Sequence, residues 1–485
     1  MSEHFHTIII GAGSGGLTVA IGLANLGKPV ALIEAHHVGG DCTNVGCVPS
    51  KTLIHLAATG HHSDPLSRVQ HKRNALRDKE TVEVGHTPNL TLIHGRAQLR
   101  DRRRVHVTLT EGKRELTADH IVIATGARPR RLDIPGLPTE RMLTNESVFE
   151  LPHMPRHLVV VGGGVIGMEL AFAFRKLGSQ VSVITTADRV MDRLVPEVAE
   201  VLEASLRQHT IPVYTSTHVR SYAAETATLE VEQDGGLITL ADVDYVLVAI
   251  GRQRNVEGLG LAAAGVAFDA RQGIRTNSYG QTNIPGIYAI GDVTPTSAFT
   301  HSANAQGRRV VQRIAFPWLP ARGPEPVYPS ATFSDPEVAQ VGLSQTAIAQ
   351  RYHPDLVQCI RIDLATLDRG YTDDVEHGFI RVDFVRLSGR ILAATIVGPR
   401  ASEMISLFTL AISERISLYQ LYRLVYPYPT YSSGVQKVAD TFMRETLPHL
   451  KRELLAYLRY RWAPGVKYHF NAKAQRGKDA KGVSV

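Results

Sequence analysis

The stretch that decides the fold, residues 7–34, reads TIIIGAGSGGLTVAIGLANLGKPVALIE. It begins with an apolar strand pattern, and a glycine-rich turn and an apolar-periodic segment typical of a helix follow, up to Gly27. A second strand pattern, 30–33, closes the unit. This order of strand, glycine turn, helix and strand predicts a βαβ unit built on a parallel sheet.

The same pattern returns 151 residues later, where residues 158–184 read LVVVGGGVIGMELAFAFRKLGSQVSVI. Both copies contain the spacing GxGxxG, formed by Gly11, Gly13 and Gly16 and by Gly162, Gly164 and Gly167. Each match follows a strand and opens a helix, where backbone N–H groups can approach a pyrophosphate. The repeat therefore predicts two nucleotide-binding units, and the alternative is a pair of ordinary glycine-rich turns.

The residue that ends the second strand of each unit discriminates between ligands. Glu34 stands 23 residues after Gly11, where a carboxylate accepts hydrogen bonds from a ribose 2′-hydroxyl. The same offset from Gly162 gives Thr185, with Arg189 and Arg193 nearby. Because no carboxylate repels a 2′-phosphate there, the second unit favours NADPH over NADH. The alternative for the two arginines is a solvated surface position.

Length and composition limit the class of protein. A chain of 485 residues is long enough for about three domains. It contains no uninterrupted run of 18 apolar residues, so a membrane-spanning helix is not expected. Three cysteines cannot build the disulfide framework of a secreted protein. We therefore expect a cytoplasmic protein in which paired cysteines are catalytic rather than structural.

The positive charge is concentrated at one end of the chain. The whole sequence has 53 basic and 46 acidic residues, a net charge of +7. Residues 444–485 contain ten lysines and arginines against three acidic residues, so the remaining chain is neutral. The charge of the body therefore gives no reason to expect nucleic-acid binding.

Two cysteines, Cys42 and Cys47, stand five residues apart between the two fingerprints. On a regular helix their side chains would point about 140° apart, so a disulfide would need a distorted turn, for which Gly46 is suited. Pro49 suits a first helical turn, and a helix beginning beside Cys47 would lower the pKa of that thiol. A zinc site would need further ligands, and Cys359 is isolated, so no metal is expected. Two inert buried thiols remain an alternative.

The segment around these cysteines, residues 40–51 (GDCTNVGCVPSK), resembles the redox-disulfide signature of the class I pyridine nucleotide-disulfide oxidoreductases. That family includes dihydrolipoamide dehydrogenase, glutathione reductase and mercuric reductase. The similarity extends over residues 5–445 through ordered motifs at 124–126, 162–169, 251–252, 288–292, 300–303 and 333–337.

The resemblance implies an α/β fold with two Rossmann-like domains and an α+β dimerisation domain. An FAD-binding domain would comprise 1–152 and 276–328, and an NAD(P)-binding domain 153–275. The dimerisation domain would span 329–445 and form a homodimer. Beyond the range of the resemblance, the residue pattern predicts a basic amphipathic helix and a polar tail over 446–485.

The resemblance also implies roles for individual residues. Nicotinamide hydride would reduce FAD, which would reduce a Cys42–Cys47 disulfide, with Cys47 nearest the flavin and Cys42 attacking the substrate. Lys51 would lie near the flavin and pair with Glu169. The first-unit glycines and Glu34 would bind the FAD pyrophosphate and ribose. Asp292 and Ala303 would hold the flavin, and Gly164, Gly167 and Gly251 would contact the nicotinamide cofactor. The other cofactor-binding candidates of the sequence are Gly40, Lys51, Thr125, Gly126, Gly162, Thr185 and Arg189.

One part of the family pattern is missing. Disulfide-reducing members have a His-Pro-Thr segment with a glutamate five residues after the histidine, which form an acid/base pair. Here Tyr428 replaces the histidine and Ser433 the glutamate. A tyrosine, with a pKa near 10, is a weak base at neutral pH. A tyrosine at this position is similar to the pattern of mercuric reductases. Those enzymes also use a cysteine pair near the C-terminus to deliver Hg(II), and no cysteine follows Cys359 here.

Three functions remain open on these grounds. The favoured one is an NAD(P)H- and FAD-dependent reductase of a small-molecule disulfide or another soft electrophile, acting through the cysteine pair. The second is a reductase of Hg(II) or quinones, or a dihydrolipoamide dehydrogenase. The third is a low-turnover redox-sensing flavoprotein.

Leucines at helical spacing with interleaved basic residues within 447–462 add the hypothesis of a peripheral membrane contact. The alternative there is a helix packed on the body.

Overall fold

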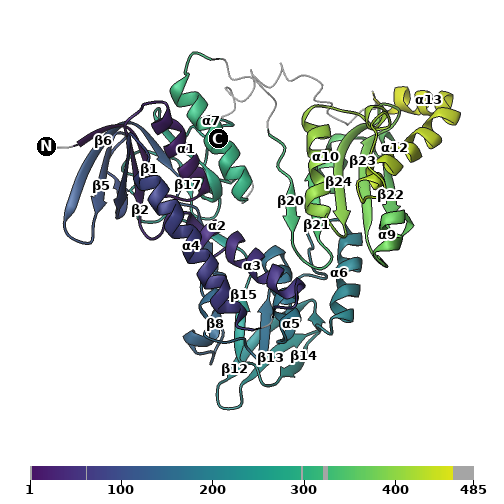
Figure 1. Cartoon of the computed structure of the whole chain (residues 1–485), viewed down its shortest axis with the longest axis horizontal. Helices are drawn as coiled ribbons and strands as arrows, with labels where there is room; N and C mark the ends of the chain where they lie inside the picture. Colours follow the sequence, from purple (N-terminus) through teal and green to yellow (C-terminus); the bar gives the residue numbers. More distant parts are fainter. Residues whose placement is uncertain (1–2, 62, 296–298, 320–325, 462–485) are drawn as a thin grey trace. The chain divides into compact units, whose positions relative to one another are not determined.

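The computed structural model describes residues 3–61, 63–295, 299–319 and 326–461 (Figure 1). The chain divides into two compact units, one formed by 1–328 and 332–335 and the other by 329–331 and everything from 336 onward. The first unit contains both glycine fingerprints and the cysteine pair.

The first sheet is built around β1 and contains the first fingerprint. Strands β1, β2, β3, β6 and β19 pair in parallel, and β5 pairs antiparallel with both β6 and β4. The order is β3 (Leu90–His94), β2 (Val30–Glu34), β1 (Glu3–Ile10), β6 (Lys113–Ile123), β5 (Arg104–Thr108) and β4 (Arg96–Leu99), and β19 (Ile287–Ala289) also pairs with β6.

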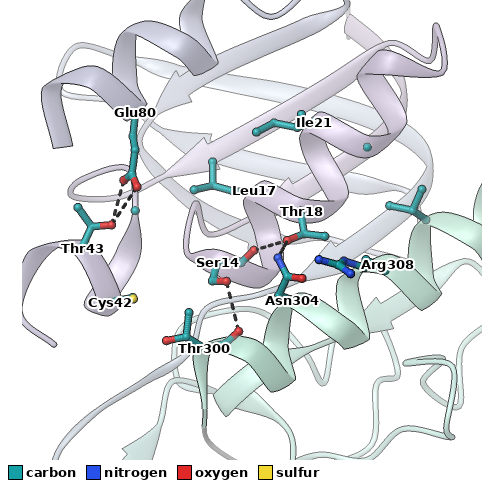
Figure 2. A pocket seen from close by; sticks show the side chains of 13 residues that line it. Ser14, Leu17, Thr18, Ile21, Cys42, Thr43, Glu80, Thr300, Asn304 and Arg308 are labelled. Carbon is teal, nitrogen blue, oxygen red and sulfur yellow. Dashed lines mark hydrogen bonds between the residues drawn. The ribbon is translucent and has the colours of Figure 1, made fainter. Parts of the chain in front are cut away.

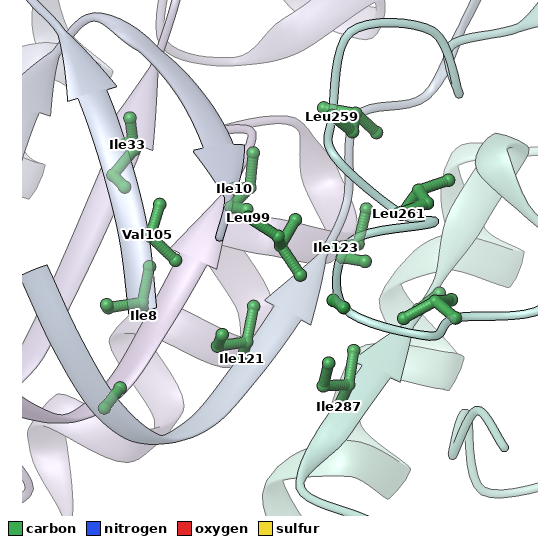
Figure 3. Packing of buried hydrophobic residues seen from close by; sticks show 14 of the residues in the cluster. Ile8, Ile10, Ile33, Leu99, Val105, Ile121, Ile123, Leu259, Leu261 and Ile287 are labelled. Atoms are coloured by element: carbon green, nitrogen blue, oxygen red, sulfur yellow. The ribbon is translucent and has the colours of Figure 1, made fainter. Parts of the chain in front are cut away.

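The isoleucine run of β1 is buried because both faces of this sheet are covered. Successive side chains of a strand point to opposite faces. Ile8 and Ile10 accordingly pack into one core cluster with Leu99 (Figure 3). Ile9 belongs to a second cluster with Leu23 of α1 (Ser14–Asn25). A continuous apolar run is the pattern expected of such a strand.

The second fingerprint lies in a five-stranded parallel sheet. Its order is β11 (Val213–Tyr214), β10 (Gln180–Ile184), β9 (His157–Val161), β15 (Tyr245–Val248) and β8 (Met142–Leu143). Strand β8 joins this sheet although it lies within the segment 1–152 assigned to the FAD domain. The domain boundaries remain a prediction.

Smaller sheets are formed by β12 (Thr217–Ala223), β13 (Thr228–Gln233) and β14 (Gly236–Leu240), by β7 (Ala127–Pro129) with β16 (Arg252–Arg254), and by β17 (Phe268–Asp269) with β18 (Gly273–Ile274).

Seven α-helices belong to the described part of the first unit. They are α1 (Ser14–Asn25), α2 (Gly40–Asn44), α3 (Cys47–Ala58), α4 (Pro65–Gly85), α5 (Val165–Lys176), α6 (Pro196–Gln208) and α7 (Thr300–Ala315). Helix α1 follows the first glycine turn and packs against α7, and α5 follows the second turn. The two predicted βαβ units are therefore present, and each helix ends two residues before the glycine predicted to terminate it.

The second unit is an α+β structure around an antiparallel sheet. The strand order is β20 (Ser330–Thr332), β21 (Val338–Gly342), β24 (Arg390–Val397), β23 (Phe379–Val385) and β22 (Val357–Asp363). Its helices are α8 (Gln345–Arg351), α9 (Asp368–Thr372), α10 (Ala401–Ser413), α11 (Leu418–Leu421), α12 (Ser433–Thr446) and α13 (Leu450–Arg461). Within the described ranges, no helix has the length and apolar character needed to cross a membrane.

Within the segment predicted to form a basic amphipathic helix, the structure has α13, preceded by a 3-10 turn, Leu447–His449. Trp462 and the polar tail up to Val485 lie outside the described residues.

Candidate active site

The two glycine turns have the same geometry. A Cβ on Gly16 would lie 1.9 Å from the carbonyl oxygen of Gly11, and one on Gly167 would lie 1.9 Å from that of Gly162. The last glycine of each fingerprint therefore allows the helix to approach the end of its strand closely. A Cβ on Gly164 would meet nothing within 4 Å, so the backbone of the second turn is open to a ligand.

The first turn also meets the redox segment. Gly40, with a φ of +58°, packs so closely on Gly13 that a Cβ on it would lie 2.7 Å from the Gly13 Cα atom. This contact brings the N-terminus of α2 to the first fingerprint.

Glu34 is held in a defined position at the carboxyl end of β2. Its Oε2 accepts a hydrogen bond from the Ala12 N–H at 2.7 Å, and its Oε1 accepts one from the His36 N–H at 2.8 Å. Each carboxylate oxygen has a further lone pair, so the side chain can still accept a hydroxyl. The fixed carboxylate of Glu34 therefore fits the ribose at the adenosine end of a dinucleotide.

The unit with the second glycine fingerprint has no carboxylate at the position that corresponds to Glu34. Thr185 is buried, and its Oγ1 accepts a hydrogen bond from the Ala187 N–H at 3.3 Å. The Arg189 guanidinium, however, forms an ion pair with Asp188 at 3.2 Å and donates to the Asp192 carbonyl at 3.0 Å. Arg189 would have to leave this pair to meet a 2′-phosphate.

The cysteines lie on separate helices joined by Val45 and Gly46. Cys42 is in α2, and Cys47 is the first residue of α3. A Cβ on Gly46 would lie 2.8 Å from the Asp41 carbonyl oxygen, so the break between the helices requires glycine. The predicted distortion at Gly46 is therefore present. In this structure the two cysteines are thiols rather than a disulfide.

The two thiols have opposite electrostatic character. A hydrogen bond from Cys42 lowers the pKa of Cys47 to about 6, and Thr300 and Lys51 act in the same direction against burial. The same bond, with burial, raises the pKa of Cys42 strongly. The position of Cys47 at a helix N-terminus also favours a thiolate. Thr300 Oγ1, at the start of α7, lies 3.6 Å from Cys47 Sγ.

Lys51 and Glu169 lie together as the resemblance implies. Lys51 Nζ donates to Glu169 Oε2 at 2.7 Å, and Glu169 is only 5% exposed in its side chain. The other carboxylate oxygen, Oε1, accepts the Phe333 N–H at 3.0 Å, and Lys51 also lies over the Phe333 ring. The carboxylate is thus satisfied on both oxygens, which a buried charge requires.

Asp41, the residue before Cys42, belongs to a second cluster of charged side chains. Arg252 forms an ion pair with Asp41 and lies 3.6 Å from the Asp292 carboxylate. Burial raises the pKa of Asp292, and Arg252 opposes that effect. The Nε atom of Arg252 is buried without a hydrogen-bond partner. The acidic and polar groups here fit the hydroxyl-rich ribityl chain of a flavin.

The remaining candidates for cofactor contact lie at strand ends or on α7. Thr125 and Gly126 follow β6, where Thr125 Oγ1 donates to the Asn255 carbonyl at 2.8 Å. Gly251 follows β15, and Ala303 is buried in α7.

Cys42 lines a cavity of about 570 Å³ between helices of the first unit (Figure 2). Ser14 and Thr18 of α1, Thr43 of α2 and Arg308 of α7 share its wall, with apolar side chains such as Leu17. Cys47 lines a different cavity, of about 410 Å³, with Lys51, Thr52, His55 and Lys72.

The residues that replace the acid/base pair lie in the second unit. Tyr428 is 75% exposed, and its hydroxyl donates to Asp368 at 2.9 Å, which raises the pKa of the tyrosine. Ser433 donates to the Thr430 carbonyl at 2.6 Å. Neither side chain has the properties of a base at neutral pH.

Sequence reasoning did not assign roles to Asp41, Arg252, Thr300 and Phe333, although all four stand in the quoted motifs. Arg252 contacts Asp41, Thr300 contacts Cys47 and Phe333 contacts Glu169, each across more than 150 residues, and no local pattern reports such a contact.

Comparison with known proteins agrees with this geometry. Residues 5–307 match the pyridine nucleotide-disulphide oxidoreductase family, and residues 328–439 match its dimerisation domain. The chain is 34% identical over 454 residues to a dihydrolipoyl dehydrogenase of Chlamydia muridarum, covering 89% of this chain and 95% of the relative. It is 34% identical over 466 residues to dihydrolipoyl dehydrogenase 3 of Pseudomonas aeruginosa, covering 90% and 98%.

Solved structures with the same fold include two flavoproteins of this kind. The HOCl-induced flavoprotein disulfide reductase RclA of Escherichia coli, as its Cu(II) complex, has a TM-score of 0.82 at 26% identity, covering 91% of this chain and 100% of that chain. LpdA of Mycobacterium tuberculosis has a TM-score of 0.80 at 27% identity, covering 90% and 99%. The predicted fold class and family are thereby confirmed. The chain belongs to the pyridine nucleotide-disulphide oxidoreductase family, and it is an FAD-dependent enzyme that exchanges electrons with a pyridine nucleotide.

Proposed function

We propose that this enzyme takes electrons from NAD(P)H and delivers them, through Cys42 and Cys47, to a small disulfide or another soft electrophile. The observation that carries the proposal is that the two adjacent thiols open onto different cavities. Cys42 faces the space in which a substrate can be held, while Cys47 shares its cavity with Lys51.

The charges on the two sulfurs suit a relay. In the reduced pair Cys47 is the thiolate and Cys42 the thiol. Cys42 Sγ attacks the substrate disulfide as its proton passes to Cys47 Sγ, so that a mixed disulfide forms and one substrate thiolate leaves. The departing thiolate takes the proton from Cys47. Cys47 Sγ then attacks Cys42 Sγ, the second substrate thiolate leaves, and two electrons have passed from the cysteine pair to the substrate.

The cofactors return the pair to the dithiol. When bound, FAD supplies two-electron transfer between the nicotinamide and the cysteine disulfide. We assign Lys51 and Glu169 to the neighbourhood of the flavin, where their paired charges would offset changes in its charge. Gly11, Gly13, Gly16 and Glu34 would hold the FAD pyrophosphate and ribose, and Gly162, Gly164 and Gly167 the pyridine nucleotide.

A homodimer is supported by the match to the family's dimerisation domain.

A preference for NADPH is supported by the absence of a carboxylate at Thr185, although Arg189 is engaged with Asp188. Anaerobic titration with NADPH and with NADH measures this preference directly. Tighter binding of NADH would contradict it.

Dihydrolipoamide oxidation is the second candidate, because the curated relatives are dihydrolipoyl dehydrogenases. The exposed Tyr428 with its raised pKa is a poor substitute for a histidine base. We therefore expect dihydrolipoamide with NAD⁺ to be a slower reaction than the reduction of a disulfide by NAD(P)H. The reverse ratio would favour the second candidate.

The decisive experiment compares Cys42→Ser with Cys359→Ser in the FAD-loaded enzyme. Reduction of lipoamide, glutathione disulfide and an aromatic disulfide is measured with NADPH and NADH. We expect Cys42→Ser to lower the rate with the accepted disulfide about 100-fold or more while FAD remains bound, and Cys359→Ser to have no effect. Full activity of Cys42→Ser would contradict the proposal. Quinone reduction that is equal in Cys42→Ala and the wild type would instead assign the turnover to the flavin alone.

A further inference from the structure

The C-terminal helix α13 has two different faces. One face packs on the second unit: Glu453 is 2% exposed and accepts from Arg386 at 2.7 Å. On the same side the Tyr460 ring stacks on His353, with 4.5 Å between ring centroids, and Tyr457 packs against a small apolar cluster. Residues 453, 457 and 460 have the spacing of one helical face, so this face fixes the orientation of the helix.

The other face consists of leucines that remain exposed among the described residues. Leu450, Leu454 and Leu458 follow one another at four-residue intervals and therefore lie in a row. Leu447 precedes this row and Leu455 lies beside it. All five are 45–69% exposed. At about 100° per residue, the leucine row is centred roughly 110° around the helix from the packed side chains. Burying the row on the same unit would therefore require the helix to rotate and would expose Glu453.

Basic residues accompany this leucine row. Lys451 and Arg459 are exposed on the same helix, and residues 444–485 contain ten basic against three acidic residues in a chain that is otherwise neutral. An exposed apolar row flanked by lysine and arginine is the pattern of a helix that lies in the plane of a membrane interface. The charge favours anionic headgroups, and the segment outside the described residues, 462–485, adds five lysines and arginines.

We propose that α13 docks on an anionic phospholipid surface through the leucine row Leu447, Leu450, Leu454, Leu455 and Leu458. The leucines enter the boundary between headgroups and acyl chains, and the basic side chains meet the lipid phosphates. A nucleic acid explains the charge but gives no use for five exposed leucines. The docking surface lies beyond residue 439, where the match to the dimerisation domain ends, and it does not depend on the substrate of the enzyme.

Vesicle flotation of the full-length, FAD-loaded protein tests this proposal. Vesicles of phosphatidylcholine alone are compared with vesicles that also contain phosphatidylglycerol, at low and high salt. We expect binding to the anionic vesicles only, with high salt weakening it. The double variant Leu454→Glu/Leu458→Glu should reduce that binding about tenfold or more. The matched control is Leu237→Glu, which places the same charge on a 68% exposed leucine of β14.

Bound FAD and circular dichroism establish that the double variant is folded, and light scattering reports its oligomeric state. Equal flotation of the double variant and the wild type would overturn the role of the leucine row, because binding would then be purely electrostatic. Absence of flotation with anionic vesicles would overturn the proposal outright. A change in oligomeric state of the double variant, without vesicle binding by the wild type, would assign the row to a contact between copies of this chain.

Discussion

Lys51 Nζ and Glu169 Oε2 lie 2.7 Å apart and join α3, which begins at Cys47, to α5, which follows the second glycine fingerprint. The pair ties the redox helix to the predicted pyridine nucleotide-binding unit. The two charges act on Cys47 in opposite directions: Lys51 lowers the pKa of the thiol and Glu169 raises it.

Single substitutions of this pair should therefore move the pKa of Cys47 in opposite directions. Lys51→Met removes a cation that stabilises the thiolate, so the pKa should rise. Glu169→Gln removes an anion and releases Lys51, so the pKa should fall. Changes in pKa of up to about 1 are expected for charges at such sites. Thiolate absorbance of the reduced enzyme as a function of pH measures both values, and shifts of the same sign in the two variants would contradict the electrostatic argument.

The hydrogen bond between the cysteines gives a second prediction, about pH. Because the thiolate is the reactive form, alkylation of Cys47 in the reduced enzyme should become faster as the pH rises through about 6 and then level off. Cys42, whose pKa is raised, should react slowly over the same range. Cys42→Ala removes the donor, so the transition for Cys47 should move up toward the ordinary thiol value near 8.5.

Mass spectrometry of the alkylated peptides identifies which cysteine has reacted. Cys42→Ser is the matched control, since its hydroxyl can still donate to the Cys47 sulfur and should retain part of the lowered pKa. An unchanged transition in Cys42→Ala would mean that the helix N-terminus and Lys51 alone account for the reactivity of Cys47.

The parts of the site that could be predicted from sequence are those encoded by short spacings. The fingerprints at Gly11 and Gly162 were recognisable because strand, glycine turn and helix follow one another within about 30 residues. From their spacing alone, Cys42 and Cys47 could form a disulfide or be two inert buried thiols. The structure favours a redox pair, because the helix break at Gly46 brings together two thiols that a regular helix would separate.

The rest depends on contacts between distant segments. Thr300 reaches Cys47 across 253 residues, and Arg252 reaches Asp41 across 211. Such pairs are created by the packing of α7 and of the strand ends, which no local pattern describes. For Arg189 the local pattern does not report the ion pair with Asp188 that the structure shows, and a contact of its guanidinium with a 2′-phosphate stays a prediction.

The third glycine of each fingerprint supplies the last prediction, which separates the two nucleotide sites. A methyl group on Gly16 or Gly167 would lie 1.9 Å from a backbone carbonyl oxygen, so the helix must move away from its strand. Such overpacking costs about 1–3 kcal/mol and opens the turn that should hold a pyrophosphate. Gly16→Ala should therefore weaken FAD retention, whereas Gly167→Ala should keep FAD and raise the KM for the pyridine nucleotide. Gly85→Ala is the control, because a Cβ there meets nothing within 4 Å. FAD content, thermal unfolding and steady-state kinetics measure the three variants, and loss of FAD from Gly167→Ala at an unchanged KM would contradict the assignment of the second fingerprint.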